Sequence, residues 1–376
     1  MIKKTFIVYN NDIPISEELR SLIEYIETNY KVEIELVDYR TKLENTNEFT
    51  LTLLYLDDIK VKTFLKNYLN SSMKIAFIPH EESLRVLGSY GVSKDGFVAI
   101  DEAMKEENLS AVDVLTCNGE IVFTNVVIGD VHGLNYKNFE EETLYAKIKS
   151  FYLNLKNLGF RDYTLTTGKG QTVETAATGV MVLEHNSKFG KYNIINEELS
   201  LHDGRLNAFI ISPTSIFSYM YYLLVVTFYA KLNPSSLPKT LGFIKTSKLD
   251  ISSTKPMDFM LDGLLMSAKE INLEVSKDAL LLSISQSAIQ NAQTNPKLED
   301  DKEIIKTQYL PKGEVKTLLL SESVPLFKKA NEDDFKELFL ALKENAQPSA
   351  IFIVLMVLST LLATTGLFQS FLHLLS

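Results

Sequence analysis

Short apolar runs alternate with segments of helical spacing along the N-terminal part of the chain. Apolar residues recur at the interval of one helical face in "ISEELRSLIEYIETN", and "IKVKTFLKNYLN" is a second predicted helix. The runs "KTFIVYN", "KVEIELVDY", "EFTLTLLYL" and "KIAFIPH" are typical of strands. Strands that alternate with helices predict a parallel α/β layer, which we assign to a nucleotide-binding-like domain over residues 1–126.

The pattern changes from Asp113 onward, where predicted strands follow one another through short turns. This spacing predicts an antiparallel β-sandwich domain over residues 127–286. The stretch "TGKGQT" lacks the glycine spacing of a phosphate loop, so it predicts a hairpin turn. A polar linker and one or two further strands, in "EVKTLLLSESVPLF", are expected over residues 287–331.

The C-terminal part of the chain is free of Asp, Glu, Lys and Arg after Glu344. About 20 apolar residues cross a bilayer as a helix, so residues 347–376 are predicted to form a transmembrane helix, with a buried core helix as the alternative. Residues 332–346 predict an amphipathic helix before it. The apolar face of that helix would carry Phe335, Leu338, Phe339 and Leu342.

A second charge-free run spans residues 206–230 and is broken by "SPTS". This break predicts a buried strand up to Ile211, followed by a helix whose cap lies near Thr214 or Ser215. The apolar helical part is short for a membrane span. It is predicted to be a core or interfacial helix, with insertion in lipid as the alternative.

Composition removes several classes of function. The net charge is −10 and no Lys/Arg cluster stands out, so nucleic acid is not an expected partner. One cysteine, Cys117, excludes an internal disulfide, and no His/Cys pair has the spacing of a structural zinc site. His132, His185 and His202 have no defined partner in sequence and are expected to be structural. The N-terminus does not have the pattern of a signal peptide.

Two strand ends carry acidic residues. Asp57 and Asp58 follow one predicted strand, in the position where open α/β sheets bind ligands, although a helix N-cap requires the same residue type. His80, Glu81 and Glu82 follow the next strand, where the alternative is again the start of a helix.

These segments, in this order, resemble the diacylglycerol kinase catalytic domain family over roughly residues 1–286. "IVYNN" stands where the family has a strand that ends in Asn-Pro, and "IPHEESLRVLGSYGVSKD" aligns with Pro-x-Gly-Thr-x-Asn-x-x-Ala. "VDVLTCNGEIVFTNVVIGD" resembles the passage to the second domain. "VLEHN" followed by "LSLHDGRLNAFII" is similar to the Asn-containing strand and Asp-Asp-Gly-Leu-Leu-Asp-Val, and "LDGL" stands where the family has Asp-Gly-Glu.

The resemblance implies an α/β domain and a β-sandwich domain, with ATP and a metal ion in the cleft between them. It implies that Asn10, Asp57, Asp58 and Asn186 are vestiges of a nucleotide site. It also implies that Asp203 and Asp262 are vestiges of a metal site, each in an Asp-Gly turn.

The chemistry that the resemblance implies is incomplete here. "YLDDIK" stands where the family has a Gly-Gly-Asp-Gly-Thr loop, so the glycines that let backbone approach phosphates are missing. Glu81 and Glu82 replace a Gly-Thr pair and place negative charge where phosphates would lie. Leu264 stands where the family has its general base, and a leucine cannot take a proton. A degenerate kinase without catalytic residues is therefore expected, with no certain cofactor.

The stretch "YLPKGEVKTLLL…TGLFQS" resembles the entry into an uncharacterised bacterial family of multi-spanning membrane proteins. We therefore expect a regulatory or ligand-sensing domain on the cytoplasmic side of the inner membrane, because several Lys residues precede the predicted span. Its expected partners are membrane lipid, other membrane-spanning subunits and a nucleotide. Two alternatives stay open: an active kinase that phosphorylates diacylglycerol or a similar lipid with ATP and Mg²⁺, and a truncated member of a transporter-like family.

Overall fold

The computed structural model describes residues 2–43, 47–131, 159–185, 201–228, 238–284, 303–321, 324–325 and a few positions between 336 and 364. Contacts divide the chain into two compact units, Met1–Phe327 and Lys328–Ser376. The first unit contains every strand that the structure describes and both halves of the fold.

The N-terminal half is built on four parallel strands in the order β2-β1-β3-β4. These strands are β1 Lys4–Tyr9, β2 Glu33–Asp38, β3 Thr50–Leu54 and β4 Lys74–Phe77. Two helices connect them, α1 Glu17–Tyr30 and α2 Asp58–Lys66, and the helices α3 Leu84–Tyr90 and α4 Gly96–Ala103 follow β4. The parallel α/β layer that the alternating pattern predicted is confirmed.

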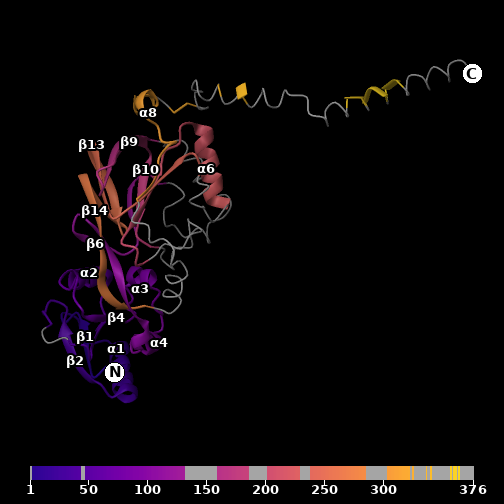
Figure 1. Ribbon diagram of the computed structural model, residues 1–376. Helices are drawn as coiled ribbons and strands as arrows, with labels where there is room; N and C mark the ends of the chain where they lie inside the picture. The colour runs from indigo at the N-terminus through magenta and orange to yellow at the C-terminus, as the bar shows by residue number, and fades with distance from the viewer. Residues whose placement is uncertain are drawn as a thin grey trace, which may run out of the picture. The chain divides into compact units, whose positions relative to one another are not determined.

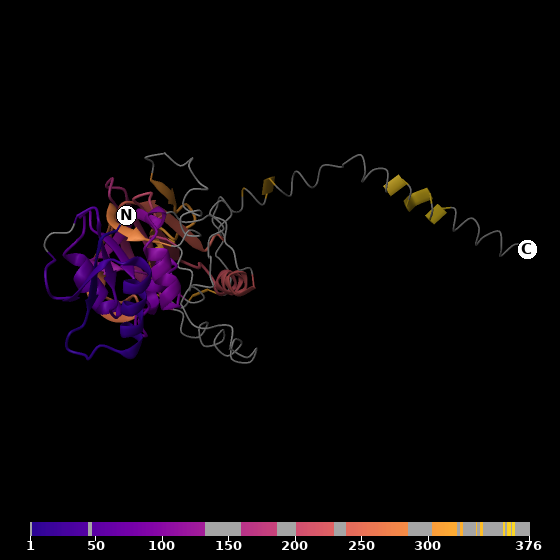
Figure 2. The ribbon, with the colours of Figure 1, turned by 90° about the horizontal axis from the view of Figure 1, so that it is seen from below.

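Helices cover both faces of this sheet because β1, β3 and β4 are apolar on both faces. One face packs against α1 and α4 through residues such as Ile7, Leu22 and Ile100. The other face packs against α2 and α3, which lie on the side of the β-rich half (Figure 1). The view from below places the N-terminus among these indigo and purple elements (Figure 2). The surface of α2 and α3 is therefore where the two halves of the unit meet.

The second half consists of antiparallel strands around a shared apolar core, as the sequence predicted. Its strands are β5 Leu109–Cys117, β6 Glu120–Val122, β7 Val126–Gly129, β8 Arg161–Thr167, β9 Thr172–Ala177, β10 Gly179–Leu183, β11 Leu206–Ile211, β12 Leu241–Thr246, β13 Lys248–Leu261, β14 Leu264–Ser283 and β15 Ile304–Lys306. The predicted turn at 167–172 is confirmed as the β8–β9 hairpin.

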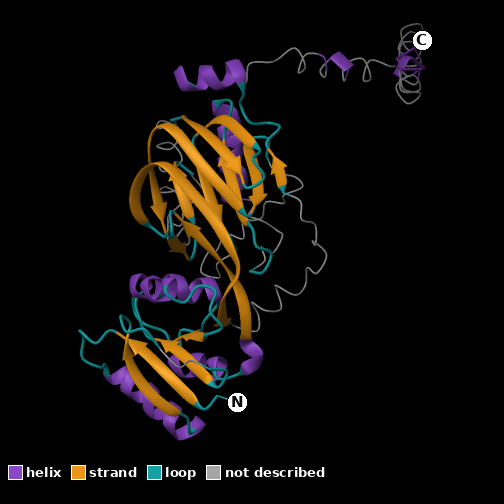
Figure 3. Ribbon diagram, turned by 60° about the vertical axis from the view of Figure 1, so that its left-hand side comes forward, coloured by secondary structure: helices purple, strands orange, loops and turns teal. Residues whose placement is uncertain are grey.

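One long strand joins the two halves. The first part of β14 pairs with β13, its middle and last parts pair with β5, and its last residues pair in parallel with β4. The strand runs from the upper β-rich half into the lower sheet in Figure 3. The sequence assigned 1–126 and 127–286 to separate domains, whereas hydrogen bonding makes one continuous sheet of both.

The charge-free run that begins at residue 206 forms β11 and then α6 Ile216–Phe228. Ser215 Oγ accepts a hydrogen bond from the Ser218 amide, which caps the helix as predicted. Tyr219, Tyr222 and Leu223 pack against the sheet, so α6 is a core helix. The face of α6 that carries these three residues packs against protein and is therefore not inserted in lipid, which was the alternative prediction.

The expectation of a strand in the first part of "EVKTLLLSESVPLF", residues 314–321, is wrong, and most of the remainder lies outside the described residues. Residues Gly313–Ser321 form a helix, α8, and the nearby strand is β15, which pairs with β12. Three successive leucines fit a strand or a helix equally well in sequence. From this helix the Lys316 ammonium forms ion pairs with Asp162 at 2.7 Å on β8 and with Glu174 at 3.3 Å on β9.

No helix within the described residues is long and apolar enough to cross a membrane. Most of the predicted transmembrane segment, 347–376, lies outside the described residues, as do most of the amphipathic segment 332–346 and the polar linker. Those predictions are not decided by the fold of the first unit.

Candidate functional site

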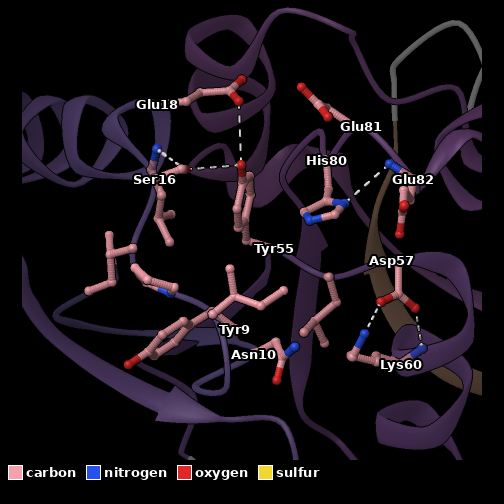
Figure 4. Close-up of a pocket in the computed structure, with 15 residues that line it drawn as sticks. Tyr9, Asn10, Ser16, Glu18, Tyr55, Asp57, Lys60, His80, Glu81 and Glu82 are labelled. Carbon is pink, nitrogen blue, oxygen red and sulfur yellow. Dashed lines mark hydrogen bonds and ion pairs between the residues drawn. The ribbon is translucent and has the colours of Figure 1, made fainter.

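A pocket of about 270 Å³ opens at the carboxyl ends of β1, β3 and β4. The chain passes from β1 to β2 on one side and from β3 to β4 on the other, so β1 and β3 flank the point where the strand order reverses. Crevices at such switch points are the usual ligand sites of open α/β sheets. Tyr9 ends β1 and Asn10 follows it, Tyr55 and Asp57 follow β3, and His80 follows β4 (Figure 4).

The start of α2 is capped by the protein itself. Asp57 Oδ1 accepts hydrogen bonds from the Ile59 amide at 3.0 Å and the Lys60 amide at 2.9 Å. Its Oδ2 forms an ion pair with Lys60 Nζ, and the Asp58 amide donates to the Glu82 carbonyl. Burial raises the pKa of Asp57, but the hydrogen bonds and charge of Lys60 outweigh it and the pKa is lowered. No amide of this first turn is left for a bound anion.

The start of α3 is capped by a carboxylate from another helix. The buried Asp58 side chain accepts from the Arg85 amide at 3.2 Å and from the Val86 amide at 3.1 Å. Burial raises the pKa of Asp58, and the charge of Asp262 raises it further. Asp58 thus connects α2 to α3 and lies beneath the pocket instead of lining it.

The loop after β4 is also closed on itself. The His80 amide donates to Ser83 Oγ at 3.0 Å, and the Ser83 amide donates to the His80 carbonyl at 3.0 Å. The Glu82 amide donates to His80 Nδ1 at 3.2 Å. Glu81 and Glu82 line the pocket and are exposed at its rim. Their predicted position beside the phosphates of a nucleotide stays a prediction.

The pocket is acidic. Four carboxylates line it, those of Glu18, Asp57, Glu81 and Glu82, against the single ammonium of Lys60. Lys60 already neutralises Asp57. The phosphates of a nucleotide would therefore meet three uncompensated negative side chains, which is electrostatically unfavourable.

Asp262 lies in the hairpin turn between β13 and β14, as predicted for this Asp-Gly pair. Both turn residues have left-handed backbone, with φ of 46° at Asp262 and 80° at Gly263. The carboxylate is buried and accepts from Lys62 Nζ at 2.5 Å.

Four further donors bind the same carboxylate. They are the Phe123 amide at 2.9 Å, the Thr124 amide and hydroxyl at 2.7 Å each, and the Asn125 amide at 3.3 Å. Burial raises the pKa of Asp262, but the charge of Lys62 and these hydrogen bonds outweigh it, so the pKa lies below its ordinary value. The charge of Asp262 is thus balanced by an internal ammonium, and both of its carboxylate oxygens accept hydrogen bonds from the protein.

Leu264 begins β14, two residues after Asp262, and its side chain is 48% exposed. Leu265 is 76% exposed beside it. An apolar side chain can neither accept nor donate a proton, so Leu264 cannot act as a general base.

Asp203, the other predicted metal residue, lies in a turn with Gly204 at φ 65°. Its carboxylate pairs with Lys245 at 2.7 Å and accepts from the Arg205 amide at 3.0 Å. The buried carboxylate of Asp113 accepts from the Gly204 amide at 2.5 Å and from the Asp278 amide at 2.8 Å. The two Asp-Gly turns therefore serve different parts of the sheet, and no group of three metal-ligating side chains exists among the described residues.

Glu184 and His185 form a buried ionisable pair that was not predicted from the sequence. Glu184 and His185 follow β10, and His185 Nδ1 bonds to Glu184 Oε2. His185 Nε2 lies 3.1 Å from the Ser89 carbonyl on α3, which leaves the imidazole with partners on both nitrogens. These contacts are consistent with the structural role expected for His185, and adjacency in sequence gave no sign of its burial. Asn186, predicted as a vestigial nucleotide ligand, lies outside the described residues.

No known protein family matches the sequence, and neither does any curated protein. Solved structures do match. A diacylglycerol kinase from Bacillus anthracis str. Sterne shares 18% identity at a TM-score of 0.51, covering 76% of this chain and 98% of its own. Two others assigned as diacylglycerol kinases from that organism share 19% identity at TM-scores of 0.54 and 0.53, covering 76% of this chain and 97% and 98% of theirs.

The chain has a diacylglycerol kinase fold. The expectation of a diacylglycerol kinase-like fold is thereby confirmed, while the division into domains at residues 126 and 127 stays a prediction. ATP and Mg²⁺, the cofactors that this fold implies, do not fit the residues present, because the amides of α2 and α3 are capped internally and Asp262 is saturated by donors. The resemblance of the C-terminal part to a membrane family finds no support in these comparisons.

Proposed function

We propose that this chain is a membrane-attached, non-catalytic diacylglycerol kinase-like protein whose pocket senses a ligand. One observation is the main support for the absence of catalysis. The amides at the start of α2 and α3, which could hold phosphates, are occupied by the carboxylates of Asp57 and Asp58. A nucleotide phosphate would have to displace an internal anion from each helix start, and it would approach through an acidic rim.

The residues at the position of the expected general base support the same proposal. Phosphoryl transfer to a hydroxyl requires a group that accepts its proton. Leu264 stands at the tip of the hairpin, and the carboxylate nearest in sequence, Asp262, is buried and saturated with donors. Neither residue can take a proton from a lipid hydroxyl at this place.

Membrane attachment rests on the sequence. The charge-free residues 347–376 are long enough to cross a bilayer as a helix, and the Lys residues that precede them favour a cytoplasmic position for the first unit at the inner membrane. In this arrangement the partners of the protein are membrane lipid and other membrane-spanning subunits.

The test is a phosphoryl-transfer assay with the full chain in mixed micelles that contain diacylglycerol, ATP and Mg²⁺. We expect no phosphatidic acid above the level of a reaction without protein, while a diacylglycerol kinase assayed in parallel turns over at a rate of about 1–100 s⁻¹. The second candidate, an active lipid kinase, is favoured by the fold alone. Turnover that is lost when Mg²⁺ is chelated would establish it and overturn the proposal.

A further inference from the structure

We propose that the pocket at the ends of β1, β3 and β4 binds a small organic cation, an ammonium or guanidinium group on a molecule of about amino-acid size. The inference rests on the proposed non-catalytic function and names the class of ligand that the pocket would sense. The ligand would be positively charged, whereas a nucleotide is negatively charged.

The first step is the supply of hydrogen-bond donors. An anion site needs free N–H groups or unpaired cations. Here the first-turn amides of α2 are bonded to Asp57 and Glu82, the Glu82 amide is bonded to His80, and Lys60 is paired with Asp57. The pocket therefore offers an anion few donors, whereas its carboxylate oxygens are acceptors that suit a cation.

The second step concerns the position of the carboxylates that have no ion-pair partner. Glu81 and Glu82 are exposed at the rim, and within the described residues neither side chain has an ion-pair or hydrogen-bond partner. Glu18 lies across from them and accepts a bond from the Tyr55 hydroxyl at 3.3 Å. Figure 4 shows Glu18 beside Tyr55, and Glu81 and Glu82 beside His80. A cation between them would face carboxylates from α1 and from the loop after β4.

The third step is the wall of the cavity, because acidity alone does not define a site. Three rings line it, those of Tyr9, Tyr55 and His80. The Tyr55 and His80 rings meet edge to face, with centroids 4.9 Å apart and an interplanar angle of 71°. The faces of aromatic rings attract organic cations, and aromatic side chains line sites for alkylammonium groups.

The fourth step concerns size and competing cations. The pocket volume of about 270 Å³ lies just below the range of about 300–1,000 Å³ that is usual for ligand pockets, so the pocket suits a molecule of about amino-acid size. Divalent metals need several oxygen ligands that converge on one point. No group of three such side chains is found in the described part of the chain, so an organic cation fits better than a metal ion.

Calorimetric titration of the full chain with agmatine in low salt tests the proposal. We expect saturable binding that weakens at least tenfold in Glu81→Gln/Glu82→Gln and in 0.3 M NaCl. The matched control is Glu24→Gln/Glu27→Gln, which makes the same change of charge on exposed positions of α1 outside the pocket. It should bind agmatine as the unchanged protein does. Butyramide, which is uncharged, should not bind.

A Tyr55→Ala variant checks the aromatic wall independently of charge, and it should also weaken agmatine binding. Equal affinity in Glu81→Gln/Glu82→Gln, absence of binding, or displacement of agmatine by ATP with Mg²⁺ would each overturn the proposal. The phosphoryl-transfer assay keeps the two conclusions apart. Without turnover and without agmatine binding, only the cation proposal fails, whereas turnover removes the proposed function itself.

Discussion

The ammonium of Lys62 lies 2.5 Å from the Asp262 carboxylate, and the two residues are 200 positions apart in the chain. Lys62 belongs to α2 and Asp262 to the tip of the β13–β14 hairpin, so this buried pair fastens the α/β half to the β-rich half. The Lys62 ammonium also lies 5.2 Å from the centre of the Phe123 ring. Because the Lys62 ammonium balances the charge of Asp262, this carboxylate needs no metal ion as a counter-charge.

We expect Asp262→Ala to lower the free energy of unfolding by about 3–5 kcal/mol, because it leaves a buried ammonium without its carboxylate. Lys62→Met should cost less, since Asp262 keeps four other donors. Denaturant unfolding measures both. Asp258→Ala, at an exposed position of β13, is the control and should change stability by less than about 0.5 kcal/mol. A loss for Asp262→Ala as small as that of the control would contradict the anchoring role.

Gly119 and Gly129 both have left-handed backbone, but only Gly129 lacks space for a side chain. Alanine at the two positions therefore distinguishes the cost of backbone strain from the cost of steric overlap. Gly119 has φ 80° with no atom near an added Cβ, whereas Gly129 has φ 67° and an added Cβ would lie 2.7 Å from the Thr178 carbonyl oxygen. We expect Gly119→Ala to cost about 1 kcal/mol from backbone conformation alone. Gly129→Ala should cost at least about 2 kcal/mol more, because the strand must shift. Equal thermal or denaturant midpoints for the two variants would refute the steric argument.

The buried Glu184–His185 pair predicts a pH dependence. Burial raises the pKa of Glu184 to about 7 despite the opposing effect of His185, while an unfolded chain would return it to 4.5. Burial lowers the pKa of His185, but the charge and hydrogen bond of Glu184 outweigh it, so this pKa is also raised above 6.5. Both groups hold protons more tightly in the native state, so their contribution to stability is full below the unfolded pKa values and falls as the pH rises.

Unfolding free energies measured at intervals from about pH 5 to 8 test this sign. Glu184→Gln removes the carboxylate and should flatten the decline over that range. Glu270→Gln, an exposed position on β14, should retain the slope of the unchanged protein. A Glu184→Gln protein whose stability falls with pH as steeply as before would show that other groups are responsible.

Removal of residues 328–376 should leave the fold of the first unit intact, because its core clusters lie entirely within Met1–Phe327. We expect an unchanged thermal midpoint by circular dichroism. We also expect release from membranes after a carbonate wash, in contrast to the full chain. Retention of the shortened protein on membranes would show that the first unit itself binds lipid and that the segment 347–376 is not the anchor.

The sequence by itself determined the order and type of most elements. The spacing of apolar residues is a local property, and it was sufficient for the α1 and α2 helices, for the parallel layer and for α6. Turn chemistry is equally local, which is why both Asp-Gly pairs were identified as turns. The missing glycines and Leu264 were also visible without a structure. The leucine run of α8 was misassigned because strand and helix are indistinguishable over so short an apolar stretch.

Only the tertiary structure decided what the acidic residues do. Asp57 and Asp58 are adjacent in sequence and chemically alike, yet one caps α2 at the pocket and the other caps α3 beneath it. Asp203 and Asp262 each precede a glycine with left-handed backbone, yet one pairs with Lys245 at a partly exposed site and the other with Lys62 in the interior. A carboxylate's role depends on which distant donors and charges the fold brings within hydrogen-bond reach. Those contacts join residues far apart in the chain, and no local pattern encodes them.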